Sequence, residues 1–346
     1  MRGQKWWRSP YSFREKLDFL KYRILSPRST PSPMPIEEGI MIERGVTTLL
    51  PCTDEFSIVF TGDLMPFGEV MPKLSNGLID FLRSSDYIVF NLEGVITEKK
   101  RVLALSHSSN QLLEYLNVFG SENVVLNVAN NHSSDFGDLV FERQNEMLQN
   151  AGFLIVGDSD APLSLDGKVS LFASTYLSNQ IPINKLPITT NHLLEWQNSD
   201  IKDDRYNIFM PHWGYEMHLS PTQEQIIVGQ ELLSNAFDAI VGNHSHTPQP
   251  IYLLRQQNVL ATSLGNFGYL NHNPNHWFGS ILKLSFLREN NPLCVKPHLS
   301  KVEVRYIRQS IEHNRIELKE VISHDYKDAR KHINYGKSQF FIDLLK

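Results

Sequence analysis

The sequence predicts an α/β layered fold with candidate ligand residues at the carboxyl ends of its strands. Short apolar runs that are typical of buried strands alternate with segments of helical periodicity. A short polar motif directly follows most of these apolar runs. Loops at the carboxyl ends of strands hold the ligands in α/β folds, so the position of these motifs indicates one shared site.

Six apolar runs are predicted to be buried strands because they combine β-branched, aliphatic and aromatic residues. They are residues 56–60, 87–90, 124–128, 206–210, 239–241 and 259–264. Further along, residues 279–308 alternate in places between apolar and polar, which favours two antiparallel strands.

Helices are predicted between these strands where apolar residues recur near a period of 3.6. One covers residues 137–151, with Leu139, Val140, Met147 and Leu148 on its apolar face, and another covers residues 221–236. A further helix is expected in the tail from 325 to 346.

The composition is that of a globular protein and excludes several functional classes. The chain has 346 residues, of which 41% are hydrophobic and 21% charged, and its net charge is −5. Nucleic-acid binders usually carry a strong basic excess, so no nucleic-acid partner is expected. The two cysteines, Cys52 and Cys294, form no CxxC motif, which excludes a thiolate zinc knuckle.

The first 30 residues differ from the rest, since eight lysines or arginines face only two acids there. Two interpretations are open: a basic amphipathic helix that contacts an anionic membrane surface or a capsule complex, and a terminal helix packed on the domain. Neither a signal peptide nor an apolar run long enough to span a membrane is recognised. The expected location is the cytoplasm. If the basic amphipathic helix contacts an anionic membrane, the protein would lie at the inner membrane face.

The sequence divides into three parts. Residues 1–35 form the basic arm and a Pro-rich linker, residues 55–310 form the main domain, and residues 311–346 form a C-terminal extension. Within the main domain, residues 176–205 are rich in prolines and polar residues and are interpreted as an insertion or lid.

Five polar motifs supply a set of metal ligands: Thr-Gly-Asp, Asn-Leu-Glu, Ala-Asn-Asn-His, Pro-His-Trp-Gly and Gly-Asn-His-Ser-His. The candidate ligands within them are Asp63, Glu93, Asn131, His212, His244 and His246. Carboxylate and amide oxygens mixed with imidazoles favour manganese, iron or zinc over calcium. Two such ions, about 3.5–4 Å apart, can share a carboxylate and activate water for attack on phosphorus or a carbonyl carbon.

Other residues of the motifs are given supporting or structural roles. His132, beside Asn131, is placed to protonate a leaving group or to orient the substrate. Trp213 and Tyr215 are expected to wall the cleft, and Asn130 alone has the character of a turn former. The histidines outside the motifs, His107 among them, are interpreted as surface or core residues.

Together, the motifs resemble those of the CapA family, also called PGA_cap, which is associated with poly-γ-glutamate capsules. The pattern of this family stands here as Gly62-Asp63, Asn91-Leu92-Glu93, Ala129–His132, His212-Trp213-Gly214, Gly242–His246 and Ser263–Phe267. The resemblance covers about residues 56–285, and the number and order of the motifs make it specific.

This family is similar in turn to calcineurin-like metallophosphoesterases, whose fold is a central β-sandwich flanked by helices. That likeness implies a first metal on Asp63, Glu93 and His246, and a second on Asn131, His212 and His244, with Glu93 bridging. His132 would be the catalytic histidine. The chain departs from the phosphoesterase pattern at Met65, where a ligand histidine is usual, so one or two ions are expected.

Two functional hypotheses follow from the resemblance. The first is a metal-dependent hydrolase acting on a phosphoester, or on an amide or ester of a polyglutamate-like or cell-envelope polymer, linked to capsule or polymer biosynthesis. The second is a non-catalytic accessory subunit of a capsule synthesis or export complex that holds an anionic polymer. A nucleic-acid phosphodiesterase is disfavoured by the acidic balance of the chain.

Overall fold

The computed structural model describes Leu17 and residues 40–320, except 43–44, 51–54, 68–70, 102–103, 180–200, 255–256, 269–276, 288–295 and 313–314. The predicted Pro-rich linker and the C-terminal helix lie outside the described residues, as do the basic arm apart from Leu17 and most of the predicted insertion.

Two large mixed sheets organise the described residues. The seven-stranded sheet has the order β1 (Ile40–Ile42), β14 (Ile251–Leu253), β15 (Val259–Ala261), β13 (Ala239–Val241), β12 (Tyr206–His212), β11 (Val169–Thr175) and β10 (Leu163–Leu165). The nine-stranded sheet has the order β4 (Lys73–Leu74), β18 (Arg315–Glu320), β17 (Leu299–Glu312), β16 (Phe278–Leu287), β3 (Glu55–Leu64), β5 (Tyr87–Leu92), β8 (Val124–Asn127) and β9 (Leu154–Val156), with β2 (Gly45–Thr48) also beside β17.

The two sheets stack face to face because their strands are apolar on both sides. Along β3, Ile58 and Phe60 contact a core shared with residues of the other sheet, such as Leu171 and Met210. Val59, which points the opposite way, packs in a separate cluster on the outer face. Burial on both faces explains why these strands are nearly continuous apolar runs in the sequence.

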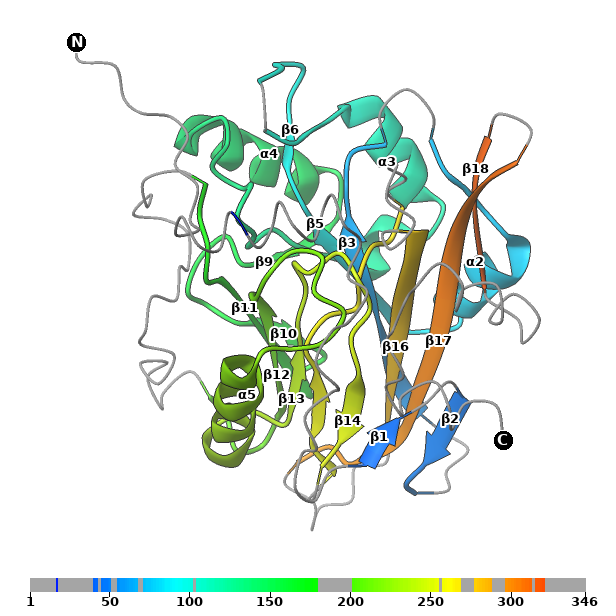
Figure 1. Ribbon diagram of the computed structural model, residues 1–346, viewed down its shortest axis with the longest axis vertical. Coiled ribbons are helices and arrows are strands. Elements are labelled where there is room, and N and C mark those ends of the chain that lie inside the picture. The colour runs from blue at the N-terminus through cyan, green and yellow to red at the C-terminus, as the bar shows by residue number, and fades with distance from the viewer. Residues whose placement is uncertain are drawn as a thin grey trace.

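Helices cover both outer faces of the sandwich. The outer face of the nine-stranded sheet packs against α2 (Asn76–Arg83), α3 (Ser109–Asn117) and α4 (Asp138–Asn150), whereas α5 (Gln223–Asn235) packs on the other sheet. In Figure 1, α5 lies beside β11, β12 and β13 at the lower left, and α3 and α4 lie at the top. The remaining elements are the short pair β6 (Val95–Ile96) and β7 (Ser106–His107) and the 3₁₀ turn Ser121–Asn123.

This architecture confirms the predicted fold class, an α/β fold with a metallophosphatase-like central β-sandwich flanked by helices. All six predicted strands are present as β3, β5, β8, β12, β13 and β15, and both predicted internal helices are present as α4 and α5. The two strands expected in 279–308 are β16 and β17, which pair antiparallel. Sequence reasoning missed α2 and α3, although Leu78, Phe81 and Leu82 have helical spacing.

The sheets also include strands outside residues 55–310, since β1 and β2 precede this range and β18 follows it. The division into arm, main domain and extension stays a prediction. Within the part of the chain that the structure describes, no helix is long and apolar enough to cross a membrane.

The topology brings the carboxyl ends of strands from both sheets to one edge of the sandwich. In the nine-stranded sheet β3, β5 and β8 run parallel, and in the other sheet β11, β12, β13 and β15 run parallel. Single β-bridges extend this edge beyond the strands, pairing Asp63 with Asn266 and His212 with Asn243. Every predicted ligand follows or ends one of these parallel strands.

A close backbone contact at Gly62 fixes the end of β3. The register between β3 and β5 shifts between Phe60 and Asp63, and the Asp63 N–H donates a hydrogen bond of 2.7 Å to the Gly265 carbonyl. A Cβ atom on Gly62 would lie 1.9 Å from that carbonyl oxygen. Only glycine fits there without displacing the backbone that positions Asp63.

We expect Gly62→Ala to lower the free energy of unfolding by about 2 kcal/mol or more, because the added methyl group overlaps backbone atoms. Gly77→Ala is the matched control: Gly77 lies in α2, and a methyl group added there would have nothing within 4 Å, so this change should stabilise by about 0.4–1 kcal/mol. Urea unfolding of both variants measures the two effects. Equal urea midpoints of unfolding for Gly62→Ala and Gly77→Ala would contradict the proposed backbone constraint at Gly62.

Candidate metal centre

The six predicted ligands converge although they come from five separate segments. Asp63 lies near the end of β3, His212 ends β12, and the other four follow β5, β8 and β13: Glu93, Asn131, His244 and His246. All six side chains are buried. Buried carboxylates and imidazoles at this density are typical of metal or catalytic sites rather than of a packed core.

One group of potential ligand atoms consists of Asp63, Glu93 and His246. The His246 Nδ1 atom lies 3.2 Å from Asp63 Oδ2 and 3.7 Å from Glu93 Oε2. One atom from each of the three residues lies within 4.8 Å of the others, a spacing that a single ion could bridge. This is the residue set that the resemblance implies for the first metal.

A second group consists of Glu93, His212 and His244, with Asn131 beside it. The His212 Nε2 atom lies 3.0 Å from His244 Nδ1, 2.8 Å from Asn131 Oδ1 and 3.9 Å from Glu93 Oε1. Glu93 belongs to both groups, so its two carboxylate oxygens face different sets of ligands. That each of these residues binds a metal stays a prediction.

The Glu93 carboxylate has an unusual environment. It is fully buried, and none of the described residues forms a hydrogen bond with either of its oxygens. Burial, countered by His246 and reinforced by Asp63, raises its pKa to about 8. A buried carboxylate without donors is costly unless a cation compensates it, so this orphaned group fits the binding of divalent metal.

The histidines divide into two electrostatic classes. Burial, followed by the positive charge of neighbouring imidazoles, lowers the pKa of His212 and of His244 well below the usual range. Burial also acts to lower the pKa of His246, but Glu93 and Asp63 outweigh it and raise that pKa to about 10. Neutral His212 and His244 have the lone pairs that metal ligation needs, whereas His246 must release a proton.

The loop after β13 holds its two histidines in strained conformations. His244 has φ 97° and His246 has φ 58°, values that residues with a Cβ rarely adopt. Contacts with the rest of the site hold them there: the His244 N–H donates to Asp63 Oδ2 at 3.2 Å, and His246 Nδ1 lies 3.0 Å from Asn266 Oδ1. Strain of this kind concentrates at functional sites, where the surrounding structure fixes it.

His132 has the arrangement of an acid–base residue. Its Nδ1 donates to Asp135 Oδ2 at 2.6 Å, and its Nε2 lies 3.9 Å from Glu93 Oε1. Burial acts to lower its pKa, but the hydrogen bond and charge of Asp135, with help from Glu93, raise it overall. Its side chain is 13% exposed, so Nε2 lies between the buried ligands and the surface.

Two expectations about the surrounding residues have different outcomes. Trp213 does not wall a cleft: it is 2% exposed, packs in the cluster under α5, and donates from its indole nitrogen to the Thr262 carbonyl at 3.0 Å. Met65 is buried two residues after Asp63 and offers only a thioether. A thioether is not one of the ligand types that favour manganese. Met65 therefore does not replace the ligand histidine that the phosphoesterase pattern has at this position.

Sequence reasoning missed several residues that support the ligands. Asn91 donates from Nδ2 to Asp63 Oδ1 at 2.7 Å and lies 3.3 Å from His212 Nδ1, so it joins the two groups. The Glu216 charge contributes to raising the pKa of Glu93 and of His132. Asn91 and Glu216 stand inside or just after recognised motifs, which is the signal that could have identified them.

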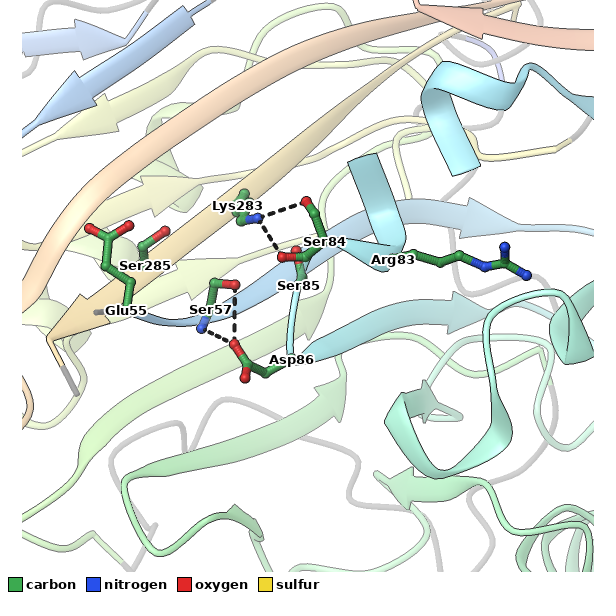
Figure 2. A pocket seen from close by; sticks show the side chains of 8 residues that line it. All are labelled: Glu55, Ser57, Arg83, Ser84, Ser85, Asp86, Lys283 and Ser285. Carbon is green, nitrogen blue, oxygen red and sulfur yellow. Dashed lines mark hydrogen bonds between the residues drawn. The ribbon is translucent and has the colours of Figure 1, made fainter. Parts of the chain in front are cut away.

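A separate polar pocket of about 430 Å³ lies at the opposite end of β3 from Asp63 (Figure 2). Its charged groups are used by the chain itself: Lys283 Nζ donates to the Ser84 carbonyl and hydroxyl, and Asp86 accepts from the Ser57 N–H at 2.8 Å. Arg83 points away from the others in Figure 2 and donates to the Val118 carbonyl. We therefore place the candidate site at the buried ligand cluster, not at this pocket.

Comparisons with known proteins agree with the motif pattern. The family model described as bacterial capsule synthesis protein PGA_cap matches residues 40–269, which include all the predicted ligands. The chain is similar to the PGA biosynthesis protein CapA of Bacillus subtilis (strain 168), with 25% identity over 248 residues, 62% of this chain and 63% of that protein. It is also similar to the capsule biosynthesis protein CapA of Bacillus anthracis, with 24% identity over 212 residues. That alignment covers 54% of this chain and 51% of the relative, so the chain spans about half to two thirds of the length of these relatives.

We expect Glu93→Gln to make the metal-free protein more stable at pH 8 by about 2 kcal/mol or more. The Glu93 pKa is about 8 in the folded state and 4.5 ordinarily, so the folded state binds this proton more tightly. The metal-free wild type must therefore lose stability as pH rises from about 4.5 through 8, whereas the amide has no proton to lose.

Urea unfolding of chelator-treated protein at pH 5 and pH 8.5 measures this difference. Added Mn²⁺ should reverse the order of stability at pH 8, because the amide cannot supply the negative charge that a cation needs. A variant that is less stable than the wild type at both pH values without metal would contradict the interpretation of Glu93.

Proposed function

The chain belongs to the PGA_cap family of bacterial capsule synthesis proteins, and we propose that it is a metal-dependent hydrolase linked to capsule or polymer biosynthesis. The proposed substrate is a phosphoester, or an amide or ester of a polyglutamate-like or cell-envelope polymer. The names of the two similar CapA proteins, which refer to PGA and capsule biosynthesis, support the link to capsule polymers.

The observation that carries the hydrolase proposal is the buried Glu93 carboxylate shared by two groups of potential ligands. A protein that only held a polymer would gain nothing from burying a carboxylate that lacks a hydrogen-bond donor among the described residues. Bound divalent cations would supply the missing charge. Asp63, Glu93 and His246 would hold one ion, and Glu93, Asn131, His212 and His244 the other.

Divalent ions at such a site polarise a substrate oxygen and lower the pKa of water toward neutral. Their identity, manganese, iron or zinc, is proposed from the mixture of carboxylate, amide and imidazole ligands. The Glu93 and Asp63 carboxylates offset much of the charge of the ions. The neutral imidazoles of His212 and His244 add ligands without adding charge.

His132 is proposed as the general acid that protonates the leaving group. Asp135 accepts the Nδ1–H, which fixes the ring and leaves Nε2 directed toward the site. The hydrogen bond and charge of Asp135 raise the pKa of His132 against the effect of burial, which favours the protonated ring that a general acid needs. An alkoxide or an amine leaves poorly without protonation, so an acid at this position serves both phosphoester and amide cleavage.

Two positioning contacts support this role for His132. The Asn179 N–H donates to the Asn131 carbonyl, in the residue before His132, at 3.0 Å. Arg101 donates from Nη1 to the Asp135 carbonyl at 2.9 Å. The turn that carries Asn131, His132 and Asp135 is therefore held from two sides, which preserves the orientation of the imidazole.

We expect His132→Ala to retain the metal content of the wild type and to lower kcat by about 10²–10⁴-fold. The loss should be greater for an alkyl phosphoester or a γ-glutamyl alkylamide than for p-nitrophenyl phosphate or a γ-glutamyl p-nitrophenyl ester, whose p-nitrophenolate leaving group needs no proton. His298→Ala, at an exposed histidine before β17, is the control and should behave as the wild type.

Metal content by mass spectrometry and hydrolysis of the four substrates separate the two hypotheses. Normal metal content with no leaving-group dependence in the His132 variant would contradict the general-acid role. Absence of hydrolysis by the wild type, with capsule formation in a complementation assay unaffected by His132→Ala, would favour the accessory-subunit role instead.

A further inference from the structure

No described residue donates a hydrogen bond to the Glu93 carboxylate, and the nearest imidazole nitrogens lie 3.7–3.9 Å away, so the backbone has a large part in setting its direction. The Glu93 N–H donates to the Leu64 carbonyl at 3.1 Å, as part of the pairing between β5 and β3. β5 itself ends at Leu92, and on the other side of Glu93 the residue Gly94, which has φ 113°, turns the chain. The carboxylate therefore stands at a turn, where regular strand pairing no longer holds the backbone.

His107 holds this turn from one side. It is 2% exposed, and its Nε2 lies 2.9 Å from the Glu93 carbonyl oxygen. A carbonyl can only accept, so Nε2 carries the hydrogen and donates. The pairing of β6 with β7 presses the ring against the turn, since a Cβ on Gly94 would lie 3.3 Å from His107 Cδ2.

Asn130 holds the turn from the other side and links it to His132. Its Nδ2 donates to the Leu92 carbonyl at 2.8 Å and to the Val128 carbonyl at 3.3 Å. Its Oδ1 accepts from the Gly94 N–H at 3.4 Å and from the His132 N–H at 3.1 Å. One buried amide thus uses all four of its hydrogen-bonding positions on backbone atoms beside Glu93 and His132.

We infer that His107 and Asn130, together called the turn clamp, are positioning residues that orient the Glu93 carboxylate between the two groups of potential ligands. Asn130 also fixes the position of His132 relative to Glu93. The inference deepens the proposed function and rests on it for its chemical consequence. Neither residue belongs to the candidate ligand set: His107 acts through the Glu93 carbonyl, and Asn130 acts through the backbone of Leu92 and Gly94.

The first test removes the His107 donor in two ways. His107→Leu keeps an apolar side chain of similar size, whereas His107→Gln retains an N–H near the end of the side chain. We expect the leucine variant to bind Mn²⁺ about 10–100-fold more weakly and to lose the magnetic coupling between bound ions in electron paramagnetic resonance spectra. The glutamine variant should recover most of the affinity and the coupling.

Asn130→Ala tests the link to His132. It should weaken Mn²⁺ binding as His107→Leu does, but it should also lower kcat at saturating Mn²⁺, because the turn of His132 loses its contact. His107→Leu, which leaves the contact between Asn130 and the His132 N–H in place, should lose less kcat than Asn130→Ala once Mn²⁺ saturates the site. If His107 and Asn130 only stabilised the fold, the two variants would not differ in how strongly they affect Mn²⁺ affinity and kcat.

Leu148→Ala controls for general loss of stability. Leu148 is fully buried on α4 in the cluster outside the nine-stranded sheet, and its truncation should cost about 2–5 kcal/mol. At a temperature where circular dichroism shows each variant to be folded, this control should bind Mn²⁺ as the wild type does. Equal weakening in Leu148→Ala and His107→Leu would overturn the inference.

Hydrogen exchange of the metal-free proteins keeps the inference testable without metal. Amides in residues 92–95 should exchange faster in His107→Leu and Asn130→Ala than in the wild type or in Leu148→Ala. Failure of the wild type to bind Mn²⁺ would refute the proposed function, while unchanged exchange in both clamp variants would refute the clamp.

Discussion

The burial of one carboxylate, that of Glu93, is the constraint on which the rest of this structure depends. A carboxylate without donors in a low-dielectric interior is unfavourable unless positive charge lies close by. The fold supplies the imidazole of His246, whose pKa is raised, on one side of it and the neutral imidazole of His212 on the other. The arrangement is costly for an empty site and favourable for one that contains cations, so the stability of the fold and its affinity for metal are linked.

The sandwich explains how such a site can be assembled at all. Parallel strands in each sheet end at the same edge, and the β-bridges at Asp63 and His212 continue the pairing into the loops. Two local features fix the backbone at this edge: the close approach of Gly62 to the Gly265 carbonyl, and the left-handed backbone of His244 and His246. Each is unfavourable in isolation, and each is held by packed strands on both sides.

The positions of six buried strands, the two internal helices and the six ligand candidates could be read from the sequence because they depend on local signals. Apolar runs buried on both faces are continuous in sequence, and the polar motifs follow them directly. Trp213 was misassigned because an aromatic residue next to a ligand has the same local appearance whether it lines a cleft or fills a core. Its contact with the Thr262 carbonyl joins residues 49 positions apart, which no local pattern reveals.

The sequence by itself determined the layered α/β fold class and which residue types end its strands, since burial and periodicity act over a few residues. The family resemblance already implied that Glu93 bridges two sites, but only the tertiary structure decided which of its oxygens lies nearer to each group and that His107 and Asn130 hold the turn that carries it. The physical reason is that these contacts join backbone and side-chain atoms of separate segments. Their partners are chosen by how the strands stack, and not by the residues adjacent to them in the chain.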